Sequence, residues 1–273
     1  MRRAARIAAG TALAALLGCA TTPVPTPMPP VPVSPVPSAA DARRSGFDFM
    51  SPQTQAVQRD DGANPAMLWV QEGEALWLRP EGPQGRACVS CHAAASNSMR
   101  GVAARFPAWD DALMRPVSLS GRIDLCRQRH QQLPASAPED QKLLSLETYV
   151  AHQSRGLPIA PDPDPRLVPF RVRGAQLFAQ RMGQLDLSCA QCHDGLTGQR
   201  LAGSTIPQGH ATGYPLYRLE WQGLGSLQRR LRGCMTGIRA EPFAPGSVEM
   251  VALELHLATR AIGMPLETPA VRP

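Results

Sequence analysis

Aromatic residues are scarce in this 273-residue sequence, where four tryptophans, three tyrosines and six phenylalanines make up 5% of the chain. The apolar run at residues 7–17 is too short to span a bilayer. The formal net charge of +6 includes Arg2, Arg3 and Arg6 near the start, so the remainder carries about +3. That excess is too small to indicate nucleic-acid binding. A strand-rich pattern is also lacking, which favours a largely helical fold with long loops.

The first residues have the features of an export signal. Residues 1–18 combine a positive region with a short apolar stretch, which predicts a signal peptide that is removed. The stretch ends in LLGC and is similar to a bacterial lipobox, so Cys19 is a predicted lipid-attachment site. An ordinary cleavage nearby, leaving Cys19 as a spare thiol, is the alternative. Eight prolines in residues 20–37 predict a stiff spacer, and we assign residues 19–44 to a lipid-attachment cysteine and linker.

One motif occurs twice, as CVSCH at residues 88–92 and as CAQCH at residues 189–193. Two cysteines separated by two residues and followed by histidine are the attachment sequence of a c-type haem. Both thiols bond to the porphyrin, and His92 and His193 then become the proximal iron ligands. The sequence predicts two covalently bound haem c groups, whose flat apolar surface would compensate for the few aromatic residues. The predicted attachment cysteines are Cys88, Cys91, Cys189 and Cys192.

The surroundings of the two motifs repeat as well. Before each motif the same pattern of aromatic residue, glycine and aromatic residue occurs, shifted by 101 residues like the cysteines. The pattern is Trp69, Gly73 and Trp77 in the first copy and Phe170, Gly174 and Phe178 in the second. After the motifs, residues 146–158 recur at 253–265 with an offset of 107. We therefore predict a mainly α fold of two tandem class I cytochrome c-like haem domains related by internal duplication. The first module is placed at 45–165 and the second, with the active site, at 166–273.

Local signals add further expectations. Residues 41–64 predict an irregular lead-in, and five prolines in residues 158–169 argue against regular structure there. A helix should begin at Asn64-Pro65 and cross the last helix of its module at a glycine, as in small cytochromes. In the second module Ser247 can cap that last helix. Its predicted apolar face consists of Val248, Val251, Leu255, Ala258 and Ile262.

Cys126 and Cys234 remain after the haem and lipid assignments. They follow His92 and His193 by 34 and 41 residues, so they occupy equivalent places in the two modules. The second axial ligand of small c-type cytochromes comes from about this part of the chain. A Cys126–Cys234 disulfide is the main alternative, and a zinc site built from the CxxC pairs is a weaker one.

Other candidate ligands do not repeat between the modules. The methionines considered are Met99, Met114, Met235, Met250 and Met264. The histidines without counterparts are His130, His152, His210 and His256, and we interpret them as surface or core residues.

Arginines surround Cys234. Arg229, Arg230, Arg232 and Arg239 lie within five residues of it, and no acidic residue falls between the first and the last of them. If this stretch is helical, Arg230 lies on the same face as the sulfur. This arrangement indicates an anion site beside a thiolate. Pairing with haem propionates, or simple solvation, is the alternative.

Several segments together resemble the SoxA family of the thiosulfate-oxidising Sox system, in its dihaem form. Besides both haem motifs, they are SGFDFMSP at 45–52, NPAMLWV at 64–70 and RGCMTGIRAEP at 232–242. The resemblance implies that Cys126 is the second ligand of the first iron and that Cys234 is that of the second. It also implies that Cys234 is the catalytic cysteine, carried as a persulfide, and that Arg230 binds substrate.

The family's reaction joins thiosulfate oxidatively to a cysteine of a SoxY-type carrier in complex with SoxZ. The implied partners are a small monohaem SoxX-type cytochrome and a c-type cytochrome that accepts electrons, with no nucleic acid. The expected location is the periplasm, with membrane contact only through a lipid on Cys19; family members are usually untethered. A non-catalytic dihaem electron-transfer lipoprotein is the alternative function. A dihaem peroxidase is disfavoured, because each iron has a candidate cysteine ligand.

Overall fold

Helices make up most of the regular structure in the computed structural model, which describes residues 42–201 and 203–273. The α-helices are α1 (Pro52–Arg59), α2 (Met67–Leu78), α3 (Cys88–His92), α4 (Ala95–Ser98), α5 (Leu119–Cys126), α6 (Gln141–His152), α7 (Val168–Ala179), α8 (Leu227–Gly237) and α9 (Val248–Arg260). Shorter 3-10 and π segments are η1 (Gly46–Phe49), η2 (Ala103–Arg105), η3 (Arg127–Gln131), η4 (Pro165–Leu167) and η5 (Gln191–Gly195). The predicted mainly α fold is confirmed. Within the described residues no helix is long and apolar enough to cross a membrane. The predicted signal peptide and Cys19 lie outside the described residues.

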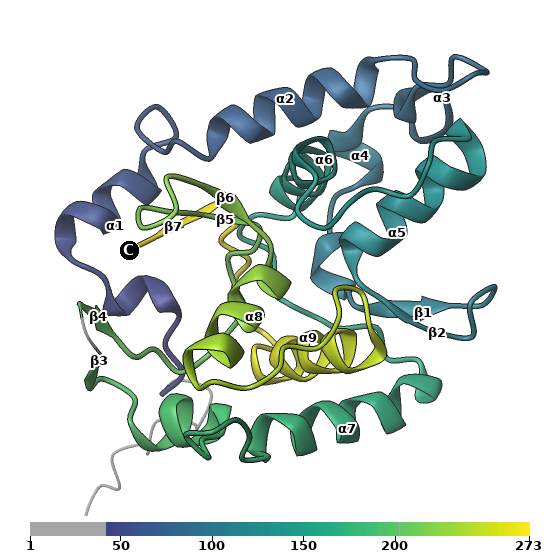
Figure 1. Cartoon of the computed structure of the whole chain (residues 1–273). Helices are drawn as coiled ribbons and strands as arrows, with labels where there is room; N and C mark the ends of the chain where they lie inside the picture. Colours follow the sequence, from purple (N-terminus) through teal and green to yellow (C-terminus); the bar gives the residue numbers. More distant parts are fainter. Residues whose placement is uncertain (1–41, 202) are drawn as a thin grey trace, which may run out of the picture. The chain divides into compact units, whose positions relative to one another are not determined.

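Short strands tie the helices together. They are β1 (Ala108–Asp110), β2 (Arg115–Val117), β3 (Arg200–Leu201), β4 (Ser204–Thr205), β5 (Leu216–Arg218), β6 (Gly223–Gly225) and β7 (Ala270–Arg272). Strands β1 and β2 form one hairpin, and β3 and β4 another. In the third sheet β5 lies between β6 and β7, with β7 parallel to it, so the C-terminal strand pairs with the β5–β6 hairpin of its own module (Figure 1).

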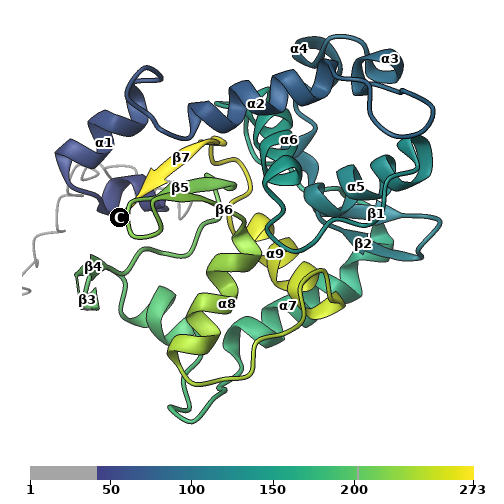
Figure 2. The same ribbon diagram turned by 45° about the horizontal axis from the view of Figure 1, so that its top comes forward.

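Two crossed helix pairs form the frame of the molecule, α2 with α6 and α7 with α9 (Figures 1 and 2). A Cβ atom on Gly73 would lie 2.2 Å from the carbonyl oxygen of Ser145 in α6. A Cβ atom on Gly174 would lie 2.0 Å from the carbonyl oxygen of Ala252 in α9. The predicted glycine crossings are therefore confirmed in both modules, since only a hydrogen atom fits at either contact.

The repeat continues beyond the helix pairs. Hairpin β1–β2 leads into α5, and hairpin β5–β6 leads into α8. Ser118 and Ser226 are the N-caps of α5 and α8, and their side chains accept hydrogen bonds from backbone amides of the first turn. Cys126 and Cys234 each follow their cap by the same number of residues, at a common offset of 108. The structure thus confirms that the two cysteines are equivalent in position.

Some local expectations were wrong. The stretch at 41–64 contains η1 and α1, because Ser45 and Ser51 cap them and Pro52 starts α1. The proline-rich stretch ends in η4 and the start of α7, where Pro169 occupies the first turn and needs no amide hydrogen bond.

The predicted face of the last helix is correct only in part. Ser247 does cap α9, and its side chain accepts a hydrogen bond from the Met250 amide. Val251 and Leu255 are buried, but Val248 and Ile262 are 38% and 49% exposed. Val248 is the first residue of α9 and Ile262 follows its C-cap Ala261, so a pattern continued to both ends overestimates the helix and its core.

Candidate functional site

The first haem motif forms one helical turn, α3, against α2. The indole Nε1 of Trp77 donates to the carbonyl of Ala93 at 3.1 Å, and the Trp77 ring centroid lies 5.7 Å from that of His92. Burial raises the pKa of the Cys88 thiol to about 11, and the negative charge of Cys126 adds to the rise. The attachment motif and Cys126 therefore lie close together.

Cys126 lies at the end of α5 among arginines whose charges are neutralised. Arg122 and Arg129 reach the same Asp110 oxygen at 3.0 and 3.6 Å, and the Asp110 side chain is only 1% exposed. Burial raises the pKa of the Cys126 thiol, the charge of Cys91 raises it further, and the two arginines only partly oppose these effects. Cys126 is thus a sulfur in surroundings that favour its neutral form.

The second haem motif presents a histidine with a fixed ring. Nδ1 of His193 donates to the carbonyl oxygen of Pro207 at 2.8 Å. A Cβ atom on Gly209 would lie 3.1 to 3.3 Å from the imidazole, so the loop after the motif passes close to the ring. Phe178 lies beside it with a centroid separation of 6.5 Å. These contacts hold the imidazole in one orientation.

Cys234 lies opposite this histidine on α8. The Ser226 hydroxyl at the start of the helix donates to Glu139 at 2.5 Å, which joins α8 to the first module. Burial is the main reason why the pKa of Cys189 is raised to about 11, and the negative charge of Cys234 is the next. The two sulfur atoms are therefore close. Burial works to raise the pKa of Cys234, but the His193 side chain works to lower it, so these two side chains also lie close together. The predicted proximal histidine and the predicted catalytic cysteine therefore meet.

The electrostatic surroundings of Cys234 differ from those of Cys126. Burial works against ionisation of Cys234, but the His193 side chain and the charges of Arg230 and Arg218 outweigh it and hold the pKa below the usual value of a thiol. Arg230 lies one helical turn before Cys234, as predicted. In the part of the chain that the structure describes, no carboxylate pairs with Arg230.

Arg218 is a residue that the sequence did not indicate. It ends β5, is only 8% exposed, and has a buried Nε without a hydrogen-bond partner. Tyr214, four residues earlier, also interacts electrostatically with Arg230, Arg218 and Cys234. The only available signal was the offset of 108 residues, which places Arg218 at the position that Asp110 holds in the first module.

Each site presents the donor set that a covalently bound c-type haem requires. Two thiols and a histidine lie in one turn, and a further sulfur, Cys126 or Cys234, approaches them. The fixed ring of His193 matches the outer hydrogen bond that usually orients a metal-binding imidazole. The residues therefore fit haem c. The six cysteines among the described residues are free, so the alternative Cys126–Cys234 disulfide is not formed.

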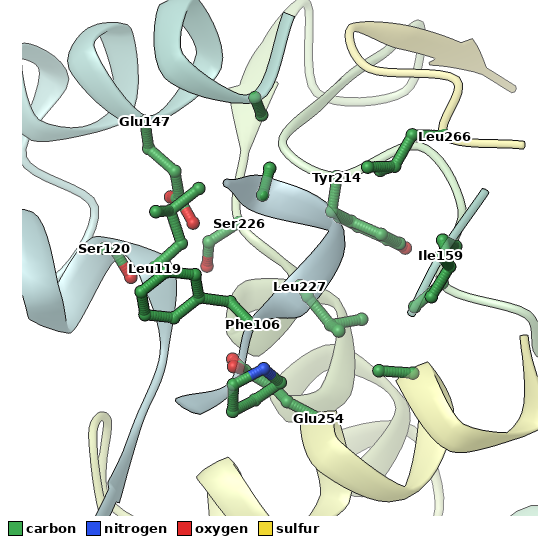
Figure 3. A pocket seen from close by; sticks show the side chains of 15 residues that line it. Phe106, Leu119, Ser120, Glu147, Ile159, Tyr214, Ser226, Leu227, Glu254 and Leu266 are labelled. Carbon is green, nitrogen blue, oxygen red and sulfur yellow. The ribbon is translucent and has the colours of Figure 1, made fainter. Parts of the chain in front are cut away.

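A cavity of ≈ 90 Å³ lies where the two modules meet, and equivalent residues of both modules line it (Figure 3). Glu147 of α6 and Glu254 of α9 enter it from opposite sides. Burial is the main reason why the pKa of Glu147 is raised to about 8, and the negative charges of Glu254 and Glu139 add to the rise. A hydrogen bond from the Ser120 amide opposes it in part. Burial raises the pKa of Glu254 to about 7, although a hydrogen bond from Gln228 works to lower it. The cavity therefore holds two carboxyl groups that resist ionisation.

The fold and the paired thiol–histidine sites define the chain as a c-type cytochrome that carries haem c. A family model described as "SoxA/TsdA, cytochrome c domain" matches residues 72–159 and 173–266. The chain therefore belongs to the SoxA/TsdA cytochrome c family.

Relatives narrow this assignment. The chain is 37% identical over 233 residues to the "L-cysteine S-thiosulfotransferase subunit SoxA" of Pseudaminobacter salicylatoxidans, covering 85% of this chain and 82% of that protein. It is 36% identical over 232 residues to the subunit of the same name from Rhodovulum sulfidophilum, covering 85% and 81%. A solved structure titled "Crystal structure of SoxXA from P. pantotrophus" matches with a TM-score of 0.81 and 32% identity, covering 85% of this chain and 87% of that chain. Within its family the chain is thus a SoxA-type L-cysteine S-thiosulfotransferase subunit. The predicted family, fold class and enzyme class are confirmed.

Proposed function

We propose that this chain catalyses the oxidative conjugation of thiosulfate to a cysteine of a SoxY-type carrier protein. The observation that carries the proposal is the position of the half-buried Cys234, which lies close to His193 and is acted on by the positive charge of Arg230. In this proposal Cys234 is the catalytic cysteine, carried as a persulfide, and Arg230 binds substrate. Both roles are those that the resemblance to the SoxA family implies for these positions, and the 37% identity to a SoxA subunit supports them.

Two haem c groups complete the proposed protein. The thioether-forming cysteines would be Cys88, Cys91, Cys189 and Cys192. The iron ligands would be His92 with Cys126 in the first module and His193 with Cys234 in the second. Haem c, when bound, supplies one-electron oxidation steps.

The chain's own residues bind and orient the reactants. Thiosulfate is a dianion, and the planar guanidinium of Arg230 can hold its sulfonate oxygens by paired hydrogen bonds. Its outer sulfur is then directed toward the sulfur carried by Cys234. In the net reaction a sulfur–sulfur bond forms between the outer sulfur of thiosulfate and the carrier's cysteine, and the carrier's S–H bond breaks. One proton and two electrons leave, and a c-type cytochrome accepts the electrons.

The proposed partners are a small monohaem SoxX-type cytochrome, the SoxYZ-type carrier and the c-type cytochrome acceptor. A SoxX-type partner is supported by the match to the SoxXA structure. We propose a periplasmic location with a tether through lipidated Cys19. Cys19→Ala should release the protein from the membrane fraction, and a protein that stays bound would contradict the tether.

The catalytic assignment is tested by comparing Cys234→Ser with Cys126→Ser in complex with the monohaem partner. Carrier protein, thiosulfate and oxidised c-type cytochrome are added, and the mass of the carrier is measured. Cys234→Ser should lose conjugation by at least about 100-fold, because the catalytic sulfur is gone, whereas Cys126→Ser keeps it within about tenfold. Conjugation by Cys234→Ser at the wild-type rate would refute the role of Cys234 as the catalytic cysteine and would favour the alternative of an electron-transfer protein.

A further inference from the structure

Arg218 is a buried cation whose charge is only partly compensated. Its side chain is 9% exposed, and the carboxylate that pairs with it in the described part of the chain belongs to Glu220, at 3.1 Å. The Glu220 side chain is 63% exposed, so water screens this ion pair. The Nε–H group of Arg218 is buried and donates to no partner among the described residues. A buried guanidinium in this condition favours binding of a further anion.

The strand that carries Arg218 leads directly to the Cys234 helix. Arg218 in β5 is in register with Gly223 in β6, and β6 ends one residue before the N-cap of α8. The Trp221 ring joins the two elements, because the guanidinium of Arg218 lies 5.3 Å from its centroid and that of Arg229 lies 4.2 Å from it. Arg218 therefore lies beside the first turn of α8, next to Arg230.

Arg218 and Arg230 act on each other and on the same sulfur. Burial lowers the pKa of Arg218, and the charge of Arg230 lowers it further. Cys234 experiences the positive charge of both. Two cations that repel each other beside one sulfur form a site for a small anion that carries more than one negative charge.

The first module shows the same position with the opposite charge. Asp110 is the counterpart of Arg218, and Arg122 is the counterpart of Arg230, both at the offset of 108 residues. Asp110 pairs with Arg122 at 3.0 Å, so the first module supplies its own anion. In the second module an arginine replaces that aspartate, and the carboxylate that pairs with it, that of Glu220, is exposed, so the site is open to an anion from outside the polypeptide.

We propose that Arg218 and Arg230 together bind the sulfonate group of thiosulfate, and that Arg218 makes the site selective for a dianionic sulfur oxyanion. The inference rests on the proposed function and deepens it by adding a second substrate-binding residue. Two guanidinium groups can share the three sulfonate oxygens while the outer sulfur of thiosulfate points toward Cys234. A haem propionate is the other anion that could occupy this place, and the experiment distinguishes the two.

The test uses the haem-loaded complex with its monohaem partner, the carrier and oxidised c-type cytochrome. Arg218→Asp restores the charge that Asp110 has in the first module, and Arg218→Lys keeps the charge but loses the planar fork. We expect the KM for thiosulfate to rise about 100-fold in Arg218→Asp and about tenfold in Arg218→Lys, with kcat changed less than about threefold. Arg229→Gln is the matched control, since Arg229 also stacks on Trp221 but is not among the residues whose charge lowers the pKa of Cys234, and its KM should stay within about threefold.

A surface variant tests the same proposal in case the Arg218 variants fail to fold. Glu220 is exposed, so Glu220→Gln should fold normally, and by freeing Arg218 it should lower the KM for thiosulfate about twofold to threefold. An unchanged KM in both Arg218→Lys and Glu220→Gln would overturn the proposal. Altered haem content or reduction potential in Arg218→Lys, with the KM for thiosulfate unchanged, would assign Arg218 to a haem propionate instead.

Calorimetric titration of thiosulfate into the complex without carrier separates this inference from the proposed function. Binding that weakens in Arg218→Lys supports the site even if the wild-type complex fails to conjugate thiosulfate. Conjugation by wild type with equal thiosulfate affinity in both proteins would leave the proposed function intact and refute the role of Arg218.

Discussion

The two modules place a cysteine at the same point of the same helix but surround it with opposite charges. Near Cys126, Asp110 is buried between Arg122 and Arg129, and the pKa of the thiol is raised. Near Cys234, Arg218 takes the place of the aspartate, and the pKa of the thiol is lowered. The two modules thus share the backbone and the cysteine but differ at one charged position. Asp110 neutralises the arginines of the first site, whereas Arg218 adds positive charge to the second.

The largest difference between the modules should appear when their equivalent arginines are changed. Arg230→Gln should lower kcat/KM for thiosulfate about 100-fold, because it removes a charge-assisted contact with the substrate. Arg122→Gln should change it less than about threefold, since Arg122 is engaged with Asp110. Steady-state conjugation assays measure both values. Similar losses in the two variants would mean that the charge difference does not assign the active site to the second module.

The helix crossings should instead respond alike. Gly73→Ala and Gly174→Ala each place a Cβ within 2.2 Å of a backbone carbonyl, so each should destabilise the protein by about 2–3 kcal/mol. Thermal unfolding followed by circular dichroism measures the loss. Gly237→Ala is the control, because no atom lies within 4 Å of its added Cβ, and it should leave the midpoint nearly unchanged. A normal midpoint for only one crossing variant would show that the helix pairs are not equivalent.

The equivalent carboxyl groups in the shared cavity predict a pH dependence. Burial raises the pKa of Glu147 to about 8 and that of Glu254 to about 7, above their usual values, so the folded protein binds protons that the unfolded chain releases. The contribution of these two carboxyl groups to the free energy of unfolding is fully present below about pH 4.5 and is lost as the pH rises through 7 to 8.

Glu147→Gln should therefore raise stability at pH 9 by on the order of 2 kcal/mol and reduce the decline between pH 6 and 9. Glu254→Gln should act in the same direction by a smaller amount, because the pKa of Glu254 is raised less. Denaturant unfolding at several pH values measures both. A steeper decline in either variant would contradict the assignment of these carboxyls.

The smallest effect is expected at Asp110. Asp110→Asn removes the negative charge shared by Arg122 and Arg129 and should destabilise the protein by about 1–2 kcal/mol, with conjugation nearly intact. Glu139→Gln is the comparison variant. It changes the carboxylate that accepts a hydrogen bond from the Ser226 hydroxyl at the start of α8, and it leaves Asp110 unchanged. If Asp110→Asn impaired conjugation as strongly as Arg230→Gln, the first module would be part of the reaction site.

Much of the candidate site could be predicted from the sequence, because the haem motifs and the Arg230–Cys234 spacing are local. One helical turn separates Arg230 from Cys234, so their proximity follows once the stretch is helical. The role of Arg218 could not be predicted this way. It reaches Cys234 from another element, and only the β5–β6 hairpin and the Trp221 ring bring it there.

The fold was predicted in the same uneven manner. The glycines at 73 and 174 marked real helix crossings, since a close backbone contact demands glycine regardless of surrounding sequence. The helix ends were less predictable, as Val248 and Ile262 illustrate, because burial at the end of a helix depends on which neighbours extend that far.

By itself, the sequence determined the duplication, the two thiol–histidine motifs and the equivalence of Cys126 and Cys234, because covalent attachment and helical spacing are local properties. Only the tertiary structure decided which cysteine is surrounded by free positive charge. That depends on whether an aspartate or an arginine, distant in sequence, is buried beside the helix, and electrostatic interactions act through space rather than along the chain.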